Sequence, residues 1–172
     1  MNTAETEVMT TNALEGPSKQ YLTFALEEET FAMDIRSVRE IIQHASMTVV
    51  PLMPNFVRGV INLRGAVVPV IDLRARFGWP AARVGKKTCI VIFDATSNHE
   101  KMELGLMVDA VSEVIDIADS NIETPPQFGT AIRRDFIQGM GKVGGAFIIV
   151  LEPSRALNID DMAALVEQAQ AT

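Results

Sequence analysis

The sequence predicts a mainly β protein that folds as two small β-barrels packed against each other. Three observations point to this fold class. Short apolar runs recur along the chain with Gly, Pro, Asn or Asp nearby, the pattern of many short strands joined by tight turns. From Tyr21 to Leu26 the side chains alternate with the period of a half-buried strand. A β-rich segment also recurs 80 residues further along, with Phe56 matched to Phe136.

The elements follow in order from the N-terminus. Residues 1–18 have no apolar periodicity, so we expect a flexible tail. A strand over 21–26 follows, and polar residues 27–30 supply the turn of a hairpin. Further short strands are expected at 31–35, 39–43, 47–50, 58–63, 66–71, 87–94, 102–108, 110–117, 136–143 and 145–151.

Two segments depart from the plain strand pattern. Residues 35–42 also fit helical spacing, with Ser37 and Glu40 placed as in a capping box. We expect a helical turn there that runs into a strand. Residues 119–135 contain two adjacent prolines and no clear period, which is typical of a long surface connection.

The C-terminal end has a different pattern. Asp160 is placed to cap an amphipathic helix over 159–172, and we expect its apolar stripe to pack on the protein's own barrel. The chain therefore divides into a tail, a two-barrel domain over 19–158 and this helix.

The repeat suggests that one β unit occurs twice in the chain. The match of 56–72 to 136–152 needs no gap, and a second match sets 31–42 over 104–115. A unit of about 65 residues buries only about 60% of its unfolded surface and is marginal alone. The two copies should therefore pack together, and two barrels in contact create a groove.

Composition narrows the functional classes. The formal net charge is −7 and the isoelectric point is near 4.8, so the overall field would repel nucleic acid or an anionic membrane surface. No stretch approaches the roughly 18 apolar residues of a membrane span, and the N-terminus lacks the pattern of a secretory signal. We expect a cytoplasmic protein whose single cysteine, Cys89, is a buried inert thiol.

The central residues resemble the signature of the CheW family of chemotaxis coupling proteins. The resemblance covers about 135 residues, from roughly 20 to 155. It rests on the run from Arg58 to Gly65, the run from Val67 to Arg74, Phe77 and Gly78, and on outlying matches at Tyr21, Phe24, Phe31, Asp34, Ile35, Val38, Glu40, Gly105, Val108, Asp109, Val111, Gly139 and Gly141.

The resemblance implies two five-stranded SH3-like barrels without an active site or cofactor. Its partners would be the regulatory domain of the chemotaxis histidine kinase and the cytoplasmic tip of chemoreceptors, and the protein would be found at receptor clusters. Carried over residue by residue, the receptor contact falls at Val38, Glu40, Gly59, Arg64 and Gly65, with Val108 and Val111 as further candidates for the groove.

The repeat gives a separate reason to single out one hairpin. Asn62 and Arg64 of the first copy become Lys142 and Gly144 in the second, so the fold tolerates the loss of this arginine. We therefore also count Asn62 among the expected partner contacts. Arg64 is then hard to explain as structural, and arginine is enriched at interface hot spots. An arginine that is solvated or paired within the chain remains the alternative.

Several other residue patterns in the chain are typical of different functions. Gly139, Gly141 and Gly144 spell the dinucleotide fingerprint, but a strand-type run follows them instead of a helix. The histidines stand alone, so no metal site is expected. Asp34 and Asp72 could form an acid/base pair, although Asp72 is better placed as a helix N-cap. A small-ligand-binding barrel, the adaptor half of a receiver-bearing protein or a detached kinase regulatory domain stays open as an alternative.

Overall fold

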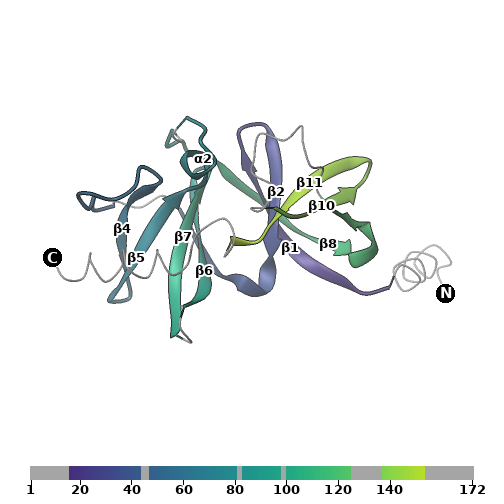
Figure 1. Cartoon of the computed structure of the whole chain (residues 1–172), viewed down its shortest axis with the longest axis horizontal. Coiled ribbons are helices and arrows are strands. Elements are labelled where there is room, and N and C mark those ends of the chain that lie inside the picture. Colours follow the sequence, from purple (N-terminus) through teal and green to yellow (C-terminus); the bar gives the residue numbers. More distant parts are fainter. Residues whose placement is uncertain (1–15, 44–46, 81–82, 98–99, 125–136, 154–172) are drawn as a thin grey trace.

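A computed structural model of the protein describes residues 16–43, 47–80, 83–97, 100–124 and 137–153. Its strands form two sheets that lie side by side along the long axis of the molecule (Figure 1). The strands are β1 (Ser18–Leu26), β2 (Glu29–Asp34), β3 (Val38–Gln43), β4 (Val57–Leu63), β5 (Ala66–Asp72), β6 (Cys89–Ser97), β7 (Glu100–Val108), β8 (Ala110–Ala118), β9 (Ile122–Glu123), β10 (Ile137–Val143) and β11 (Ala146–Leu151). Short helical turns lie between them: η1 (Ile35–Ser37), α2 (Leu73–Arg76) and η2 (Asp119–Asn121).

The two sheets have the same strand order. The sheet of barrel I runs β3-β6-β7-β5-β4, and the sheet of barrel II runs β8-β1-β2-β11-β10, with β9 added at its edge. Position by position, β3 corresponds to β8, β6 to β1, β7 to β2, β5 to β11 and β4 to β10. The prediction of two five-stranded SH3-like barrels related by an internal repeat is confirmed, with β9 as an additional edge strand.

The barrels exchange strands between the two sequence copies. The first copy supplies β1 to β5, and the second supplies β6, β7, β8, β10 and β11. Barrel I nevertheless combines β3, β4 and β5 with β6 and β7, while barrel II combines β1 and β2 with the remaining strands. Each barrel is thus built from both copies, an arrangement that the linear repeat did not reveal.

The repeat is reproduced at the level of single pairs. Val70 on β5 lies opposite Gly105 on the parallel strand β7, and Val150 on β11 lies opposite Ala32 on β2 in the same way. The register also shifts at the same place in both hairpins, between Val57 and Gly59 and again between Ile137 and Gly139. Equivalent sequences therefore give equivalent bulges.

The core has three parts. One cluster lies within barrel I around Ile90 and Ile92, and another lies within barrel II around Tyr21 and Val150. The third and largest cluster draws residues from both sheets and forms the seam between the barrels. Residues 90–93 of β6 and 104–108 of β7 are therefore buried with apolar surroundings on both faces, whereas the other ends of these strands contain charged or polar residues.

The expected turn before β3 is present. Residues 35–37 form a 3₁₀ turn that runs directly into β3, as predicted. The capping box at Ser37 and Glu40 was wrong, because Asp34 caps the turn by accepting a hydrogen bond from the Arg36 amide at 2.9 Å.

Two further expectations need correction. The strand expected at 47–50 is reduced to a single bridge between Thr48 and Val60. Ser18, assigned to the flexible tail, already pairs with Ala118 as the first residue of β1. The rest of the expected tail, up to residue 15, and the expected helix over 159–172 lie outside the described residues.

Within the described residues, no helix has the length and apolar character that crossing a bilayer requires.

Candidate functional site

The predicted contact residues Asn62, Arg64 and Gly65 come together in the hairpin between β4 and β5. Leu63 pairs with Ala66, so Arg64 and Gly65 form a two-residue turn. Both have positive φ, 54° and 86°, the pattern of a type I′ turn. The Asn62 Oδ1 accepts a hydrogen bond from the Gly65 amide at 3.0 Å and closes the turn.

Arg64 occupies a backbone conformation that its own side chain disfavours. In barrel II the equivalent turn is Gly144 and Gly145, with φ of 56° and 82°. Glycine adopts this conformation without a steric cost, whereas the Cβ of arginine crowds the backbone. Strained residues of this kind concentrate at binding sites. The turn therefore does not need an arginine for its shape.

Arg64 forms an ion pair with Glu40 on β3. β3 and β4 are the two outer strands of the sheet of barrel I, so the pair links its opposite edges. The hydrogen bond to Glu40 raises the pKa of the Arg64 guanidinium above its ordinary value. The Arg64 side chain is 67% exposed, so a guanidinium and a carboxylate lie together on the outer surface.

Gly59 makes room for a neighbouring backbone segment and has no side chain to form a contact itself. A Cβ at this position would lie 2.6 Å from the carbonyl oxygen of Thr48. That oxygen accepts a hydrogen bond from the Val60 amide at 2.9 Å, and the Thr48 amide donates to Val60 over the same distance. Gly59 thus allows the segment around Thr48 to lie against β4.

The three predicted valines lie nearer the seam. Val38 and Val111 hold equivalent positions on β3 and β8, opposite Phe93 and Phe24, and both are partly buried against the shared core. Val108 is fully buried in that core. The expectation that Val108 lines a surface groove is therefore corrected, because β7 is covered on both faces.

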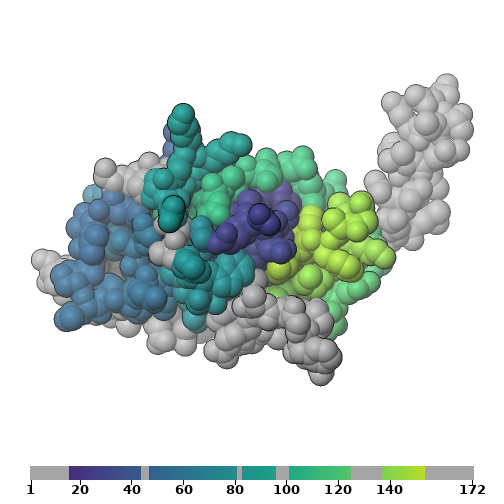
Figure 2. Space-filling model, turned by 90° about the horizontal axis from the view of Figure 1, so that it is seen from above, coloured from purple at the N-terminus to yellow at the C-terminus, as the bar shows by residue number. Residues whose placement is uncertain are grey.

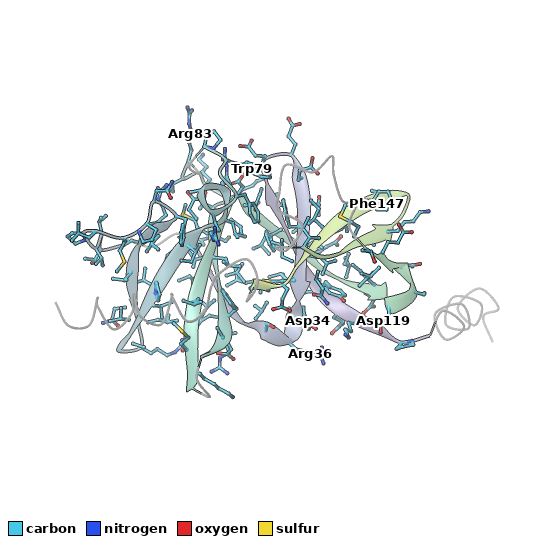
Figure 3. The ribbon with its side chains drawn as sticks, in the orientation of Figure 1. Asp34, Arg36, Trp79, Arg83, Asp119 and Phe147 are labelled. Atoms are coloured by element: carbon cyan, nitrogen blue, oxygen red, sulfur yellow. The ribbon has the colours of Figure 1, made fainter. Side chains whose placement is uncertain are left out.

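The two carboxylates of the enzyme alternative are both engaged in local structure. Asp34 pairs with Arg36 at 2.7 Å, and the hydrogen bond from Arg36 lowers the pKa of that carboxyl (Figure 3). Asp72 is completely buried and accepts hydrogen bonds from two amides at the start of α2, at 3.0 and 3.3 Å. It also lies 3.4 Å from the Arg58 guanidinium. Asp72 is thus the predicted N-cap.

The remaining motifs have structural roles. Gly139 and Gly141 lie inside β10, Gly144 lies in the hairpin turn, and strand β11 follows, so no helix N-terminus is available for a phosphate. In the part of the chain that the structure describes, no three His, Cys, Asp or Glu residues gather as metal ligands would. Cys89 is only partly buried, and its thiol donates to the Lys87 carbonyl at 3.3 Å.

We call Glu40, Asn62, Arg64 and Gly65 the hairpin site. Two residues beside it were not predicted from the sequence. Thr48 fixes the segment over Gly59, and the carboxylate of Glu103 on β7 adds to the negative field around Arg64. The position of Thr48 shortly before Pro51 and Pro54 could have indicated a segment with limited strand pairing. No sequence feature could have placed Glu103 near Arg64, because parallel pairing of β5 with β7 is not visible in the sequence.

Together, these features define a two-barrel β scaffold with an exposed ion pair beside one hairpin. Comparison with known proteins identifies the family. The model of the CheW-like domain matches residues 20–161. The chain therefore belongs to the CheW-like domain family.

Several named relatives match most of the chain. The chemotaxis protein CheW of Rhizobium meliloti is 34% identical over 134 residues, which cover 78% of this chain and 84% of the relative. CheW of Klebsiella aerogenes is 30% identical over 84% of this chain and 85% of the relative. The crystal structure of the scaffolding protein TtCheW from Thermoanaerobacter tengcongensis is similar with a TM-score of 0.71 and 39% identity, covering 79% of this chain and 85% of that one.

Proposed function

We propose that this chain is a coupling adaptor of bacterial chemotaxis that joins chemoreceptors to the chemotaxis histidine kinase and catalyses no reaction itself. Family membership over residues 20–161 is the observation that carries the proposal. Relatives over most of the chain are named chemotaxis proteins, and the similar crystal structure is of a scaffolding protein. A ligand-binding barrel or an enzyme using Asp34 and Asp72 has no comparable support.

The finer assignment concerns where each partner binds. We assign the cytoplasmic tip of the receptor to the hairpin site, with Arg64, Glu40, Asn62 and Gly65 as its outer part and the partly buried valines Val38 and Val111 towards the seam. The kinase regulatory domain then binds another face. Through these partners we expect the protein at receptor clusters on the cytoplasmic side of the membrane.

The chemistry of the hairpin supports this assignment. A guanidinium carries five donors in a planar fork and can bind a partner carboxylate or helix carbonyls while it remains beside Glu40. Arg64 is exposed and therefore accessible to a partner. Glycine forms the equivalent turn in barrel II, so the strained arginine is not needed for the shape of the turn. An interaction with a partner would account for both features.

A reconstituted kinase assay tests the function. The kinase, a receptor cytoplasmic fragment and this protein are combined, and kinase autophosphorylation is measured with each component left out in turn. The proposal predicts that receptor control of the kinase requires this protein, and that both partners co-purify with it. Receptor control that is unchanged without the protein would refute the adaptor function.

A further inference from the structure

Charge is divided unequally between the two barrels. The described residues of barrel I, between 38 and 108, include nine Lys or Arg and five Asp or Glu, a net charge of +4. The described residues of barrel II include three basic and ten acidic residues, a net charge of −7. An acidic protein therefore carries one locally basic half, and residues 73–93 contain no acidic residue at all.

Part of this positive charge stands on one loop, residues 83–87, which we call the basic loop. Its sequence is Arg-Val-Gly-Lys-Lys, and all five residues are exposed. The loop has a fixed shape, since the Gly85 amide donates to the Thr88 Oγ1 at 2.8 Å and the Thr88 amide donates to the Gly85 carbonyl at 3.3 Å. Val84 adds an apolar side chain that is 48% exposed.

The charges of the basic loop lack the ion-pair partners that five arginines elsewhere in the described chain have. Arg36, Arg39, Arg58, Arg64 and Arg74 each form an ion pair with an Asp or Glu. Among the described residues, no such pair is formed by the three basic side chains of the loop. Three like charges within five residues repel one another, and nothing in the described fold offsets that repulsion.

The basic loop lies at the opposite end of barrel I from the Arg64 hairpin. The loop leads into Cys89, which pairs with Val108, while Ser97 at the far end of β6 pairs with Glu100. β5 runs parallel to β7 and places Asp72 beside Met107, so its other end, after the Arg64 turn, lies near the start of β7. Arg83 and Trp79 accordingly lie at the top of barrel I in Figure 3. Figure 2 looks down on this end of the molecule, where teal residues from the middle of the chain form part of the visible surface.

We propose that the basic loop is a docking surface for an acidic segment of a protein partner. Its three cations would attract a short run of carboxylates in the partner. The exposed Val84 would pack against one apolar side chain within that run. This surface is separate from the hairpin site and extends the proposed function, on which it depends only for the choice of binding partners to test.

A protein segment fits better than an extended polyanion. Membrane attraction typically needs about four to eight basic residues, and nucleic-acid binding commonly involves about six to ten phosphate contacts. The loop offers three cations, and the acidic barrel II would repel any polyanion that extended across the molecule. A compact acidic segment can contact the loop without approaching barrel II.

The test compares two triple variants of the full chain with equal charge changes. The loop variant is Arg83→Ser, Lys86→Ser and Lys87→Ser. The control replaces the exposed Lys19, Lys101 and Lys142 by Ser. Association rates with the kinase regulatory domain and with a receptor fragment are measured at about 50 mM and about 500 mM salt. High salt screens the long-range attraction between charges, so the comparison shows how much of the rate depends on that attraction.

We expect the loop variant to bind at least one of the two proteins about 10-fold more slowly than wild type at low salt, with the difference shrinking at high salt. The control should change the rate by less than about 3-fold. Equal slowing by both variants, or no slowing by the loop variant, would overturn the inference. Loss of binding to anionic vesicles or duplex DNA in the loop variant alone would overturn the choice of a protein partner.

A second readout separates this inference from the proposed function. If wild type binds neither protein, the adaptor function is refuted, and carbodiimide coupling to a polyglutamate peptide decides the inference instead. Preferential coupling at Lys86 and Lys87 over Lys19, Lys101 and Lys142 supports a docking surface for carboxylates. Uniform coupling across all five lysines contradicts it.

Discussion

At the scale of single residues, the hairpin site depends on two glycines with different physical roles. Gly65 has a φ of 86°, and a Cβ built on it would meet open space. Gly59 has a φ of 155°, and a Cβ built on it would strike the backbone of Thr48. The first glycine permits a backbone angle, and the second mainly permits close approach of two segments.

We predict that Gly59→Ala destabilises the protein more than Gly65→Ala. Alanine at Gly65 costs about 1 kcal/mol of backbone strain, because its Cβ crowds the backbone at positive φ. At Gly59 the added Cβ must also displace a hydrogen-bonded carbonyl, for about 2 kcal/mol or more. Urea unfolding of both variants measures the difference. A smaller loss for Gly59→Ala than for Gly65→Ala would show that the Thr48 segment moves freely.

Sequence reasoning at this scale succeeded where the signal was local. The Asp72 cap followed from its place before an apolar turn. It failed at Val108, because single-sequence patterns do not tell which strands are covered on both faces. The partner of Arg64 was equally hidden, since Glu40 lies on the far edge strand.

At the scale of elements, the 3₁₀ turn η1 is held by Asp34 in two ways. Its carboxylate accepts a hydrogen bond from the Arg36 amide and forms an ion pair with the Arg36 side chain. The side-chain hydrogen bond from Arg36 lowers the pKa of Asp34 below the ordinary value of 3.8. The turn is therefore linked to pH.

We predict that the stability difference between wild type and Asp34→Asn depends on pH. Asparagine keeps the capping acceptor but removes the charge. A carboxyl whose pKa is lower in the folded state stabilises the fold above its unfolded-state pKa, and this stabilisation is lost as pH falls through the folded-state pKa. The advantage of wild type should hold from about pH 7 down to about pH 4, and it should shrink progressively between about pH 4 and about pH 2, as the pH falls through the lowered folded-state pKa.

Urea midpoints measured across this pH range provide the test, with Arg36→Gln as a matched control. Removal of the arginine should abolish most of the same pH dependence while leaving the carboxylate in place. A stability gap between wild type and Asp34→Asn that persists undiminished at the acidic end would contradict the link.

The strand over 21–26 was predicted, although it is buried on both faces and not half-buried. The hairpin of β4 and β5 with its equivalent of β10 and β11 was predicted from the repeat. The strand expected at 47–50 was wrong because Pro51 and Pro54 follow it. The chain turns at Pro51 and Leu52, and proline has no amide hydrogen with which to extend a sheet ladder, so only the bridge at Thr48 forms.

At the scale of the whole molecule, the two barrels depend on each other because they exchange strands. Barrel I takes β6 and β7 from the second sequence copy, and barrel II takes β1 and β2 from the first. The largest apolar cluster also spans the seam. The sequence showed two copies but not the exchange, since β1 and β6 are equally apolar and periodicity does not identify their neighbours.

We predict that a chain cut between β5 and β6, at residues 81–82, yields two fragments that fold only together. Each fragment contains the strands of one sequence copy and lacks partners for its inner strands, so each alone exposes the seam. Circular dichroism of the separate and mixed fragments measures this. The mixture should regain the β spectrum of the intact chain at a 1:1 ratio.

A cut after β7 provides the comparison, because barrel I is contiguous over residues 38–108. The N-terminal fragment of this cut contains all five strands of barrel I. It should keep more structure than either fragment from the cut at residues 81–82. Independent folding of either piece from the cut at 81–82 would show that the barrels follow the sequence copies after all.

The assignment of the receptor to one hairpin is tested most directly by Arg64→Gly, which gives barrel I the turn of barrel II. Unfolding and titration with a receptor fragment are measured for this variant and for Gly144→Arg. We predict that Arg64→Gly is as stable as wild type or more stable, because glycine relieves the positive φ, yet binds the receptor at least about 10-fold more weakly. Gly144→Arg should lose stability and bind normally. Receptor affinity that is unchanged in Arg64→Gly would contradict the assignment.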